Sequence, residues 1–127
     1  GLYPPGTAGL IVCNPPWLPG KAGTALESAV YDPDSQMLSA FLDGAAAHLA
    51  PGGEAWLIMS DLAELLGLRP PDELTSRIAA AGLRVIARLD APPESKAARN
   101  RADPLYFARS REVVSLWRLG SSQPHRP

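Results

Sequence analysis

The chain has 127 residues, with 12 Lys or Arg against 13 Asp or Glu, which gives a net charge of −1 at pH 7. This length fits one domain with a substantial core, and the balanced charge does not indicate a membrane or nucleic-acid surface. The single cysteine, Cys13, excludes an internal disulfide framework and a cysteine-rich zinc site, and we expect it to be a small buried residue. The sequence has no long apolar segment and no secretory signal, which favours a cytoplasmic protein without membrane contact.

The first expected element is the apolar run LIVC at residues 10–13, which is too short for a helix and predicts a buried strand. The run ends at Asn14, and the next two residues are Pro15 and Pro16. These prolines fix two successive φ angles, so no helix can begin there. The sequence therefore predicts a stiff, extended NPPW segment (Asn14, Pro15, Pro16 and Trp17) at the end of a strand.

The NPPW segment offers groups that suit a planar target bearing an amino group. The amide oxygen of Asn14 and the carbonyl of Pro15 can accept hydrogen bonds from the amine, and stacking on Trp17 would contribute ~1–3 kcal/mol for a nucleobase. Accepting the protons turns the amine's lone pair toward an electrophile without a strong base. We therefore predict Asn14 and Pro15 as catalytic residues, and Pro16 and Trp17 as substrate-binding residues. The alternative is a proline-rich turn with a core tryptophan.

A loop, a helix and a strand are expected next. Residues 18–34 contain several Pro and Gly without a steady period, which predicts a long loop beside the NPPW segment. Apolar residues at helical spacing predict a helix from residue 34 or 35 to 49, capped by Asp34 or Ser35. Pro51-Gly52-Gly53 should end it firmly. The following apolar run predicts a second buried strand at 54–60.

The remaining elements are two helices and two strands, expected at 61–66, 71–81, 83–89 and 112–119. Ser60 and Asp61 are expected to cap the first of these helices. Apolar and charged residues alternate in the first of these strands, which should be half covered. Residues 91–111 form the most charged segment of the chain. Residues 120–127 have no apolar anchor and are expected to be a mobile tail.

The order strand, helix, strand, helix, strand, strand predicts an α/β fold. Helical crossovers imply parallel neighbouring strands with helices on the sheet faces, while the last two strands have no helix between them and should pair antiparallel. Two histidines, of which His125 lies in the tail, leave no hydrolase triad. His48 is expected on the surface at the end of its helix. The residues show no metal-binding cluster, so we expect no metal.

Asn14-Pro15-Pro16-Trp17 resembles the Asn/Asp-Pro-Pro-aromatic motif of amino-group methyltransferases that use S-adenosylmethionine (SAM). Over residues 8–119 the chain is similar to the C-terminal half of their Rossmann-like fold, in which the final strand inserts antiparallel between its two predecessors. The resemblance implies a partial methyltransferase domain at 1–119, followed by the tail. It also implies SAM as the cofactor, with Asn14 as the residue of this chain that contacts it.

The cofactor half of that fold is not found in this sequence. In the family, SAM sits on a glycine-rich loop after the first strand, and an acidic residue at the end of the second strand holds the ribose. The sequence has no G-x-G-x-G run and begins at what resembles the fourth strand. We therefore expect the 127 residues alone to bind SAM poorly and to be inactive.

The amine that is methylated can be of three kinds. Release-factor glutamine methyltransferases are similar around Trp17-Leu18-Pro19 and Tyr31-Asp32-Pro33. Ribosomal-RNA guanine methyltransferases are more similar in the helix and in the turn His48-Leu49…Gly52-Gly53-Glu54. Adenine amines are a third option. Lys96, Arg99 and Arg101 should follow a strand parallel to the first and could meet RNA phosphates, which favours an RNA nucleobase. A degenerate domain that only binds a partner is the non-catalytic alternative.

The strand that ends at Cys13 is also expected to have an open edge. In the resembled fold this strand is covered on one side by the first strand, which this chain lacks. An open apolar edge is a template for pairing with another chain. We therefore expect a homodimer formed through the strand edge between Leu10 and Cys13.

Overall fold

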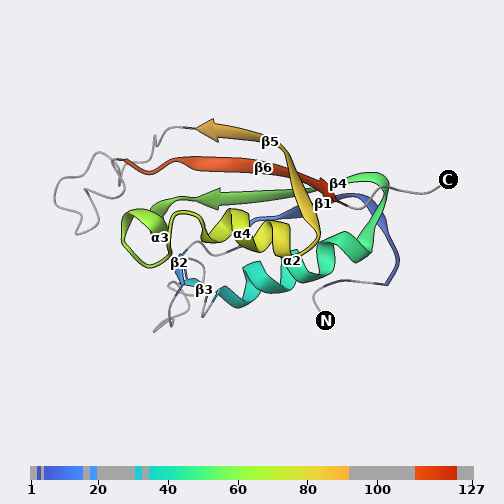
Figure 1. Ribbon diagram of the computed structural model, residues 1–127, viewed down its shortest axis with the longest axis horizontal. Helices are drawn as coiled ribbons and strands as arrows, with labels where there is room; N and C mark the ends of the chain where they lie inside the picture. Colours follow the sequence, from blue (N-terminus) through green and yellow to red (C-terminus); the bar gives the residue numbers. More distant parts are fainter. Residues whose placement is uncertain are drawn as a thin grey trace.

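The computed structural model describes residues 3, 5–15, 18–19, 31–32, 35–91 and 111–122, and the structural statements below concern these residues. They form a four-stranded sheet, a separate two-stranded parallel pair and three helices (Figure 1). The elements in chain order are β1 (Ala8–Cys13), β2 (Leu18–Pro19), β3 (Tyr31–Asp32), α2 (Gln36–His48), β4 (Leu49–Ser60), α3 (Leu62–Leu65), α4 (Glu73–Ala80), β5 (Leu83–Ala91) and β6 (Val114–Ser121).

The large sheet has the strand order β1-β4-β6-β5. β1 is parallel to β4, and β6 is antiparallel to both β4 and β5, so β4 and β5 run in the same direction with β6 between them. This is the α/β sheet with an inserted antiparallel strand that the sequence predicted, and the fold class is confirmed. The carboxyl ends of β1, β4 and β5 lie at one border of the sheet, which we call the carboxyl rim.

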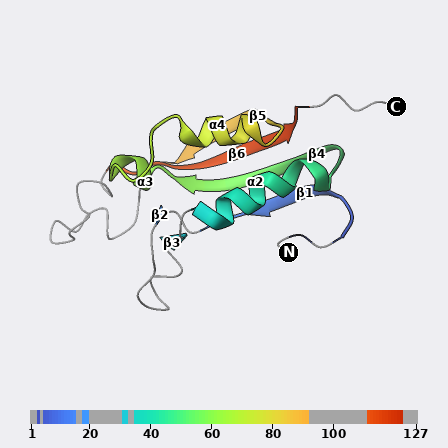
Figure 2. The ribbon, with the colours of Figure 1, turned by 60° about the horizontal axis from the view of Figure 1, so that its bottom comes forward.

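The described helices lie against one face of the sheet, which we call the covered face (Figures 1 and 2). α2 lies over β1 and β4, and α4 lies against β5. Alternation along the strands sends every second side chain into this layer. The buried core combines residues of both helices and of β4, β5 and β6: Leu38, Phe41, Leu42, Ala45, Leu49, Ala55, Leu57, Met59, Leu74, Ile78, Leu83, Trp117 and Leu119.

The opposite face of the sheet, the open face, carries apolar side chains on β1. Ile11 and Cys13 pack against the core, so alternation places Leu10 and Val12 on the open face, where they are 50% and 55% exposed. The prediction of a buried first strand was therefore wrong for these two side chains, and Cys13 is only half-buried. The physical reason is that β1 is the end strand of the sheet and the described helices cover its other face.

Several boundaries differ from the sequence prediction. Residues 18–19 and 31–32, within the expected loop, pair as β2 and β3. β4 begins at Leu49 rather than at residue 54, so the glycine turn belongs to the strand. There Gly53 passes so close to β1 that a Cβ would lie 3.0 Å from the carbonyl oxygen of Ala8. β6 runs through Ser121, two residues into the expected tail, and 123–127 lie outside the described residues.

The predicted helix caps act differently from what the sequence suggested. Ser35 is the N-cap of α2 by position, but its side chain makes no capping hydrogen bond. Its hydroxyl instead accepts a hydrogen bond of 3.1 Å from Arg69. Asp61 precedes α3, yet the amide of Leu62 donates to the hydroxyl of Ser60 at 3.0 Å. None of the described helices has the length and apolar character needed to cross a membrane.

Candidate functional site

The carboxyl rim carries the described half of the NPPW segment. β1 ends at Cys13, and the two residues that follow are Asn14, which is exposed, and Pro15, which is buried. A buried proline with a fixed φ anchors the backbone immediately after the exposed amide. Pro16 and Trp17 lie outside the described residues, so their predicted stacking role stays a prediction.

The end of β4 is next to β1 at the rim and is held by hydrogen bonds with the segment before β6. The buried hydroxyl of Ser60 donates a hydrogen bond to the carboxylate of Glu112, which is itself buried. The carboxylate of Asp61 accepts a hydrogen bond of 2.8 Å from the amide of Val113. These contacts join positions that are 52 residues apart in the chain, and they fix the rim beside Asn14.

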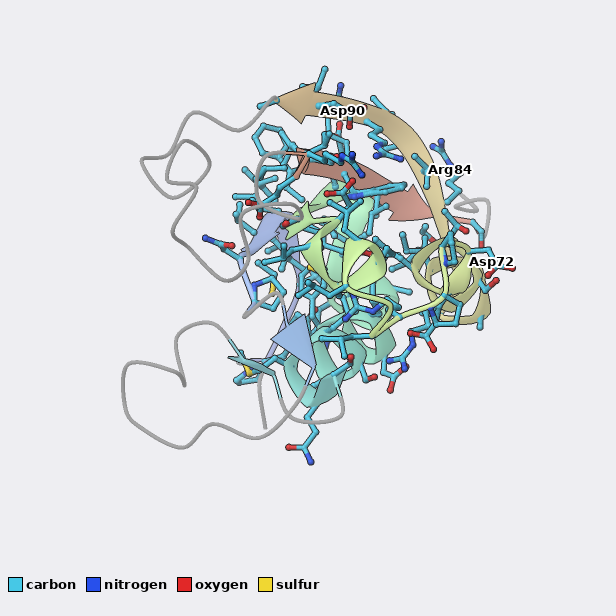
Figure 3. All side chains as sticks on the ribbon, turned by 90° about the vertical axis from the view of Figure 1, so that its left-hand side faces the viewer. Asp72, Arg84 and Asp90 are labelled. Carbon is cyan, nitrogen blue, oxygen red and sulfur yellow. The ribbon has the colours of Figure 1, made fainter. Side chains whose placement is uncertain are left out.

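The end of β5 carries a second polar group on the rim (Figure 3). The hydroxyl of Ser115 donates to Asp90 at 2.6 Å, and Nε of Arg88 donates to the same carboxylate oxygen at 2.7 Å. These two hydrogen bonds, that of Ser115 first, lower the pKa of Asp90. The guanidinium of Arg88 also lies over the ring of Trp117, 4.6 Å from its centroid. Asp90 therefore stays ionised and Arg88 is held in place.

Between these strand ends and the helices lies a cleft of about 240 Å³, which we call the rim cleft. The polar groups in its lining come from β4, α3, α4, β5 and β6: Ser60, Asp61, Glu64, Thr75, Arg88 and Ser115. Met59, Leu74 and Trp117 are among its apolar walls. Asn14 is not part of the lining, so the rim carries two separate features, one at β1 and one between β4 and β5.

A buried arginine supports the wall of the rim cleft. The side chain of Arg69 is only 1% exposed and lies 3.4 Å from the carboxylates of both Glu64 and Glu73. One oxygen of Glu64, Oε2, is buried without a hydrogen-bond partner in the structure. A single guanidinium is thus shared between two carboxylates, and the charge of Glu64 is only partly compensated.

The expected RNA-binding residues Lys96, Arg99 and Arg101 lie outside the described residues. The charged side chains described above at the rim are mostly acidic. Four of them are carboxylates (Asp61, Glu64, Asp90 and Glu112), and the basic ones are Arg69 and Arg88. Sequence reasoning missed this cluster because Ser60 and Asp61 were interpreted as helix caps. No group of three or more His, Cys, Asp or Glu in the described part of the chain is arranged to hold a metal ion.

His48 and Tyr3 lie at the other end of β1, away from the rim. The ring of Tyr3 stacks on His48 with 4.3 Å between centroids, and its hydroxyl donates to the carbonyl of Phe41 at 2.6 Å. Burial first, and then Cys13, raises the pKa of Tyr3 to about 12. Gly44 leaves room for this ring, because a Cβ there would overlap it. His48, expected at the surface, is half-buried and has a packing role.

Comparison with known proteins finds a likeness among solved structures. No protein-family model matches the chain, and no curated protein matches it. Among solved structures it is similar to a mutant of the 16S rRNA (adenine(1408)-N(1))-methyltransferase with cosubstrate SAM from Catenulisporales acidiphilia, at 19% sequence identity and a TM-score of 0.46. The match covers 94% of this chain and 56% of that one, so the chain spans just over half the length of that enzyme.

Proposed function

We propose that the chain is the substrate-facing half of a SAM-dependent N-methyltransferase that acts on the amino group of a planar substrate. The observation that carries this proposal is the position of Asn14 and Pro15. An exposed amide followed by a buried proline lies at the carboxyl end of a strand, on the rim where α/β sheets place their ligands. Asn14-Pro15 is also the described half of the motif whose resemblance suggested this activity.

Asn14 and Pro15 hold the amine in this proposal. The Oδ1 atom of Asn14 and the carbonyl oxygen of Pro15 each accept a hydrogen bond from one N–H of the NH₂ group. The lone pair of the nitrogen then points away from both acceptors, and the same two oxygens stabilise the positive charge that the nitrogen gains. SAM, when bound, supplies the methyl group as the electrophile. The methylated amine loses its extra proton afterwards, so no strong base is needed.

The described residues do not form a complete SAM site. The rim cleft has a volume of about 240 Å³, which is below the roughly 300–1,000 Å³ of pockets for drug-sized ligands, and Asn14 does not line it. A larger pocket of about 310 Å³ is lined by residues of α2 and α4 and the residue after α4, and no described strand end borders it. The sequence also lacks a G-x-G-x-G run. In the proposed enzyme SAM is therefore held mainly by a second half, and the 127 residues alone are inactive. Asn14 is the residue of this chain that also meets the methyl donor.

The proposed substrate is an RNA nucleobase, bound by Pro16, Trp17 and the phosphate contacts of Lys96, Arg99 and Arg101. A second candidate is a protein glutamine, as in the release-factor methyltransferases. The acidic side chains of the described rim support this second candidate, because they repel phosphate groups. A domain that only binds a partner would retain Asn14 on the rim but show no methyl transfer.

The experiment uses the longest natural polypeptide that contains this sequence. It is incubated with SAM carrying a labelled methyl group, and with RNA or with protein from the same cells as acceptor. We expect label in RNA, on an exocyclic base nitrogen. Label in protein glutamine would establish the second candidate. Absence of transfer to either, together with no heat on titration with SAM, would contradict the enzyme proposal and leave a binding module.

We further propose that a second copy of the chain pairs with the free side of β1. In the described part of the chain β1 pairs only with β4. Its sequence, AGLIVC, carries no charge, and Leu10 and Val12 are half exposed. A second β1, antiparallel to the first, would satisfy both strand edges at once by a two-fold axis.

A further inference from the structure

The described chain on both sides of residues 16–17 adjoins one stretch, residues 58–62, which we call the β4–α3 junction. On one side, Cys13 is opposite Leu57 in the parallel pairing of β1 with β4, and β4 continues beyond that pair. The end of β4 therefore extends past the end of β1 next to Asn14, at the usual strand spacing of roughly 5 Å. On the other side, β2 contacts α3, the helix that begins at the junction (Figures 1 and 2). The described NPPW residues thus depend on where this junction lies.

Hydrogen bonds with Glu112 and Val113 hold the β4–α3 junction. The hydroxyl of Ser60 donates to the carboxylate of Glu112 and accepts a hydrogen bond of 3.0 Å from the amide of Leu62. The amide of Asp61 donates to the carbonyl of Val113 at 3.1 Å, and its carboxylate accepts a hydrogen bond of 2.8 Å from the amide of Val113. Glu112 and Val113 lead into β6, which is on the opposite side of β4 from β1. The junction beside Asn14 is therefore held in place from the far side of β4.

Glu112 is a buried carboxylate whose hydrogen bond restrains the junction. It is 6% exposed, and Ser60 is 2% exposed. Burial of a carboxylate or a hydroxyl is costly without a hydrogen bond. Movement of the junction away from Glu112 would separate these two groups inside the protein, so their hydrogen bond favours one position of the junction.

From these contacts we infer that Glu112 is a positioning residue for the proposed methyl transfer. Through Ser60 it sets the place of the β4–α3 junction, and with it the place of Asn14 and Pro15 relative to the methyl donor. A misplacement of roughly 1 Å can lower a rate by about 10²-fold when the reacting groups must be aligned. Glu112 needs no contact with the amine or with SAM for this role. The inference rests on the proposed function and adds a residue that acts on the same site from a distance.

The test measures kcat and the Kd for SAM in the longest natural polypeptide that contains this sequence. Glu112→Ala removes the acceptor of the Ser60 hydroxyl and should lower kcat by about 10- to 100-fold, while the Kd for SAM changes by less than about threefold. Glu112→Gln keeps an acceptor oxygen and should restore kcat to within about threefold of the unchanged polypeptide.

Glu54→Gln is the matched control, because it removes a carboxylate of β4 that binds Arg118 away from the rim. It should keep kcat within about threefold of the unchanged polypeptide. Equal losses of kcat in Glu112→Ala and Glu54→Gln would show an effect of stability alone and would overturn the inference. So would unchanged kcat in Glu112→Ala, or a Glu112→Gln variant that is as slow as Glu112→Ala.

Ser60→Ala tests whether Glu112 acts through Ser60, and it takes the place of Glu112→Ala if that variant does not fold. It should lower kcat to a similar extent, and adding Glu112→Ala to it should lower kcat by less than about threefold more. Amide hydrogen exchange in the peptide spanning residues 10–19 should be faster in Ser60→Ala than in Glu54→Gln. Losses of kcat that multiply, or equal exchange in the two variants, would contradict the inference.

Failure of the proposed function gives a different result from failure of this inference. If the function is wrong, the unchanged polypeptide transfers no methyl group, and the role of Glu112 falls with it. If only the inference is wrong, the unchanged polypeptide is active and Glu112→Ala and Ser60→Ala are as active as Glu54→Gln.

Discussion

The two edge strands of the sheet, β1 and β5, are built in opposite ways. β5 carries Arg84, Arg88 and Asp90 along its length and has a register irregularity between Val85 and Ala87 (Figure 3). Charges and bulges are the usual devices that keep an edge strand from pairing with another chain. β1 has the sequence AGLIVC, with no charge, and its irregularity is confined to its start. One edge is therefore protected from pairing, and the other is suited to it.

The largest expected effect concerns self-association of the chain through β1. Val12→Lys places a charge on the unprotected edge and should weaken self-association by about 10- to 100-fold, because pairing would then bury a lysine. Leu89→Lys adds the same charge to β5, which is already protected, and should leave association unchanged. Sedimentation over a range of concentrations measures both. A chain that is monomeric at every concentration, before any substitution, would refute the role given to β1.

A smaller effect on the free energy of unfolding is expected from the charged side chains of β5. Arg88→Ala removes the ion pair with Asp90 and the contact with Trp117, and should lower the free energy of unfolding by about 1 kcal/mol. Arg84→Ala, on the same strand, is exposed and should change it by less than about 0.5 kcal/mol. Urea unfolding measures both variants. If both substitutions lower the free energy of unfolding by the same amount, the contacts of Arg88 with Asp90 and Trp117 do not stabilise β5.

The smallest effect is a pH dependence of stability that arises on the open face of the sheet. Hydrogen bonds from Arg118 and then Trp56 lower the pKa of Glu54 from 4.5 to about 2. The resulting stabilisation is complete above about pH 4.5 and is lost as the pH falls toward 2, because the unfolded chain binds the proton first. Glu54→Gln should therefore be less stable than the unchanged chain near neutral pH. A difference that does not shrink in acid would contradict this assignment.

The sequence was sufficient for the order of the strands of the large sheet and of the helices between them, and the family resemblance implied the inserted strand. Leu38, Phe41, Leu42 and Ala45 recur at helical spacing, and all four are buried in α2. Periodicity could not reveal which apolar face is covered, since Leu10 and Val12 are as apolar as the core residues but half exposed. It also could not show that the hydroxyl of Ser35 contacts Arg69 instead of capping α2, because that contact depends on tertiary packing.

For the site, the sequence located the end of β1 but not the rim beside it. Asn14 and Pro15 stand out because polar residues and prolines follow an apolar run. The contacts of Ser60 with Glu112, and of Ser115 with Asp90, join residues 52 and 25 positions apart. They arise from the register of β6 between β4 and β5, which no local pattern encodes.

The central claim is that Asn14 accepts the hydrogen bond of the amine that is methylated. In the longest natural polypeptide that contains the chain, Asn14→Ala should lower kcat by about 10²- to 10³-fold while the Kd for SAM changes little, and Asn14→Asp should retain more activity because it keeps the acceptor oxygen. Gln36→Ala, at an exposed position of α2, serves as the control and should keep full activity. An equal loss of kcat and of SAM affinity in Asn14→Ala, or unchanged kcat, would contradict the claim.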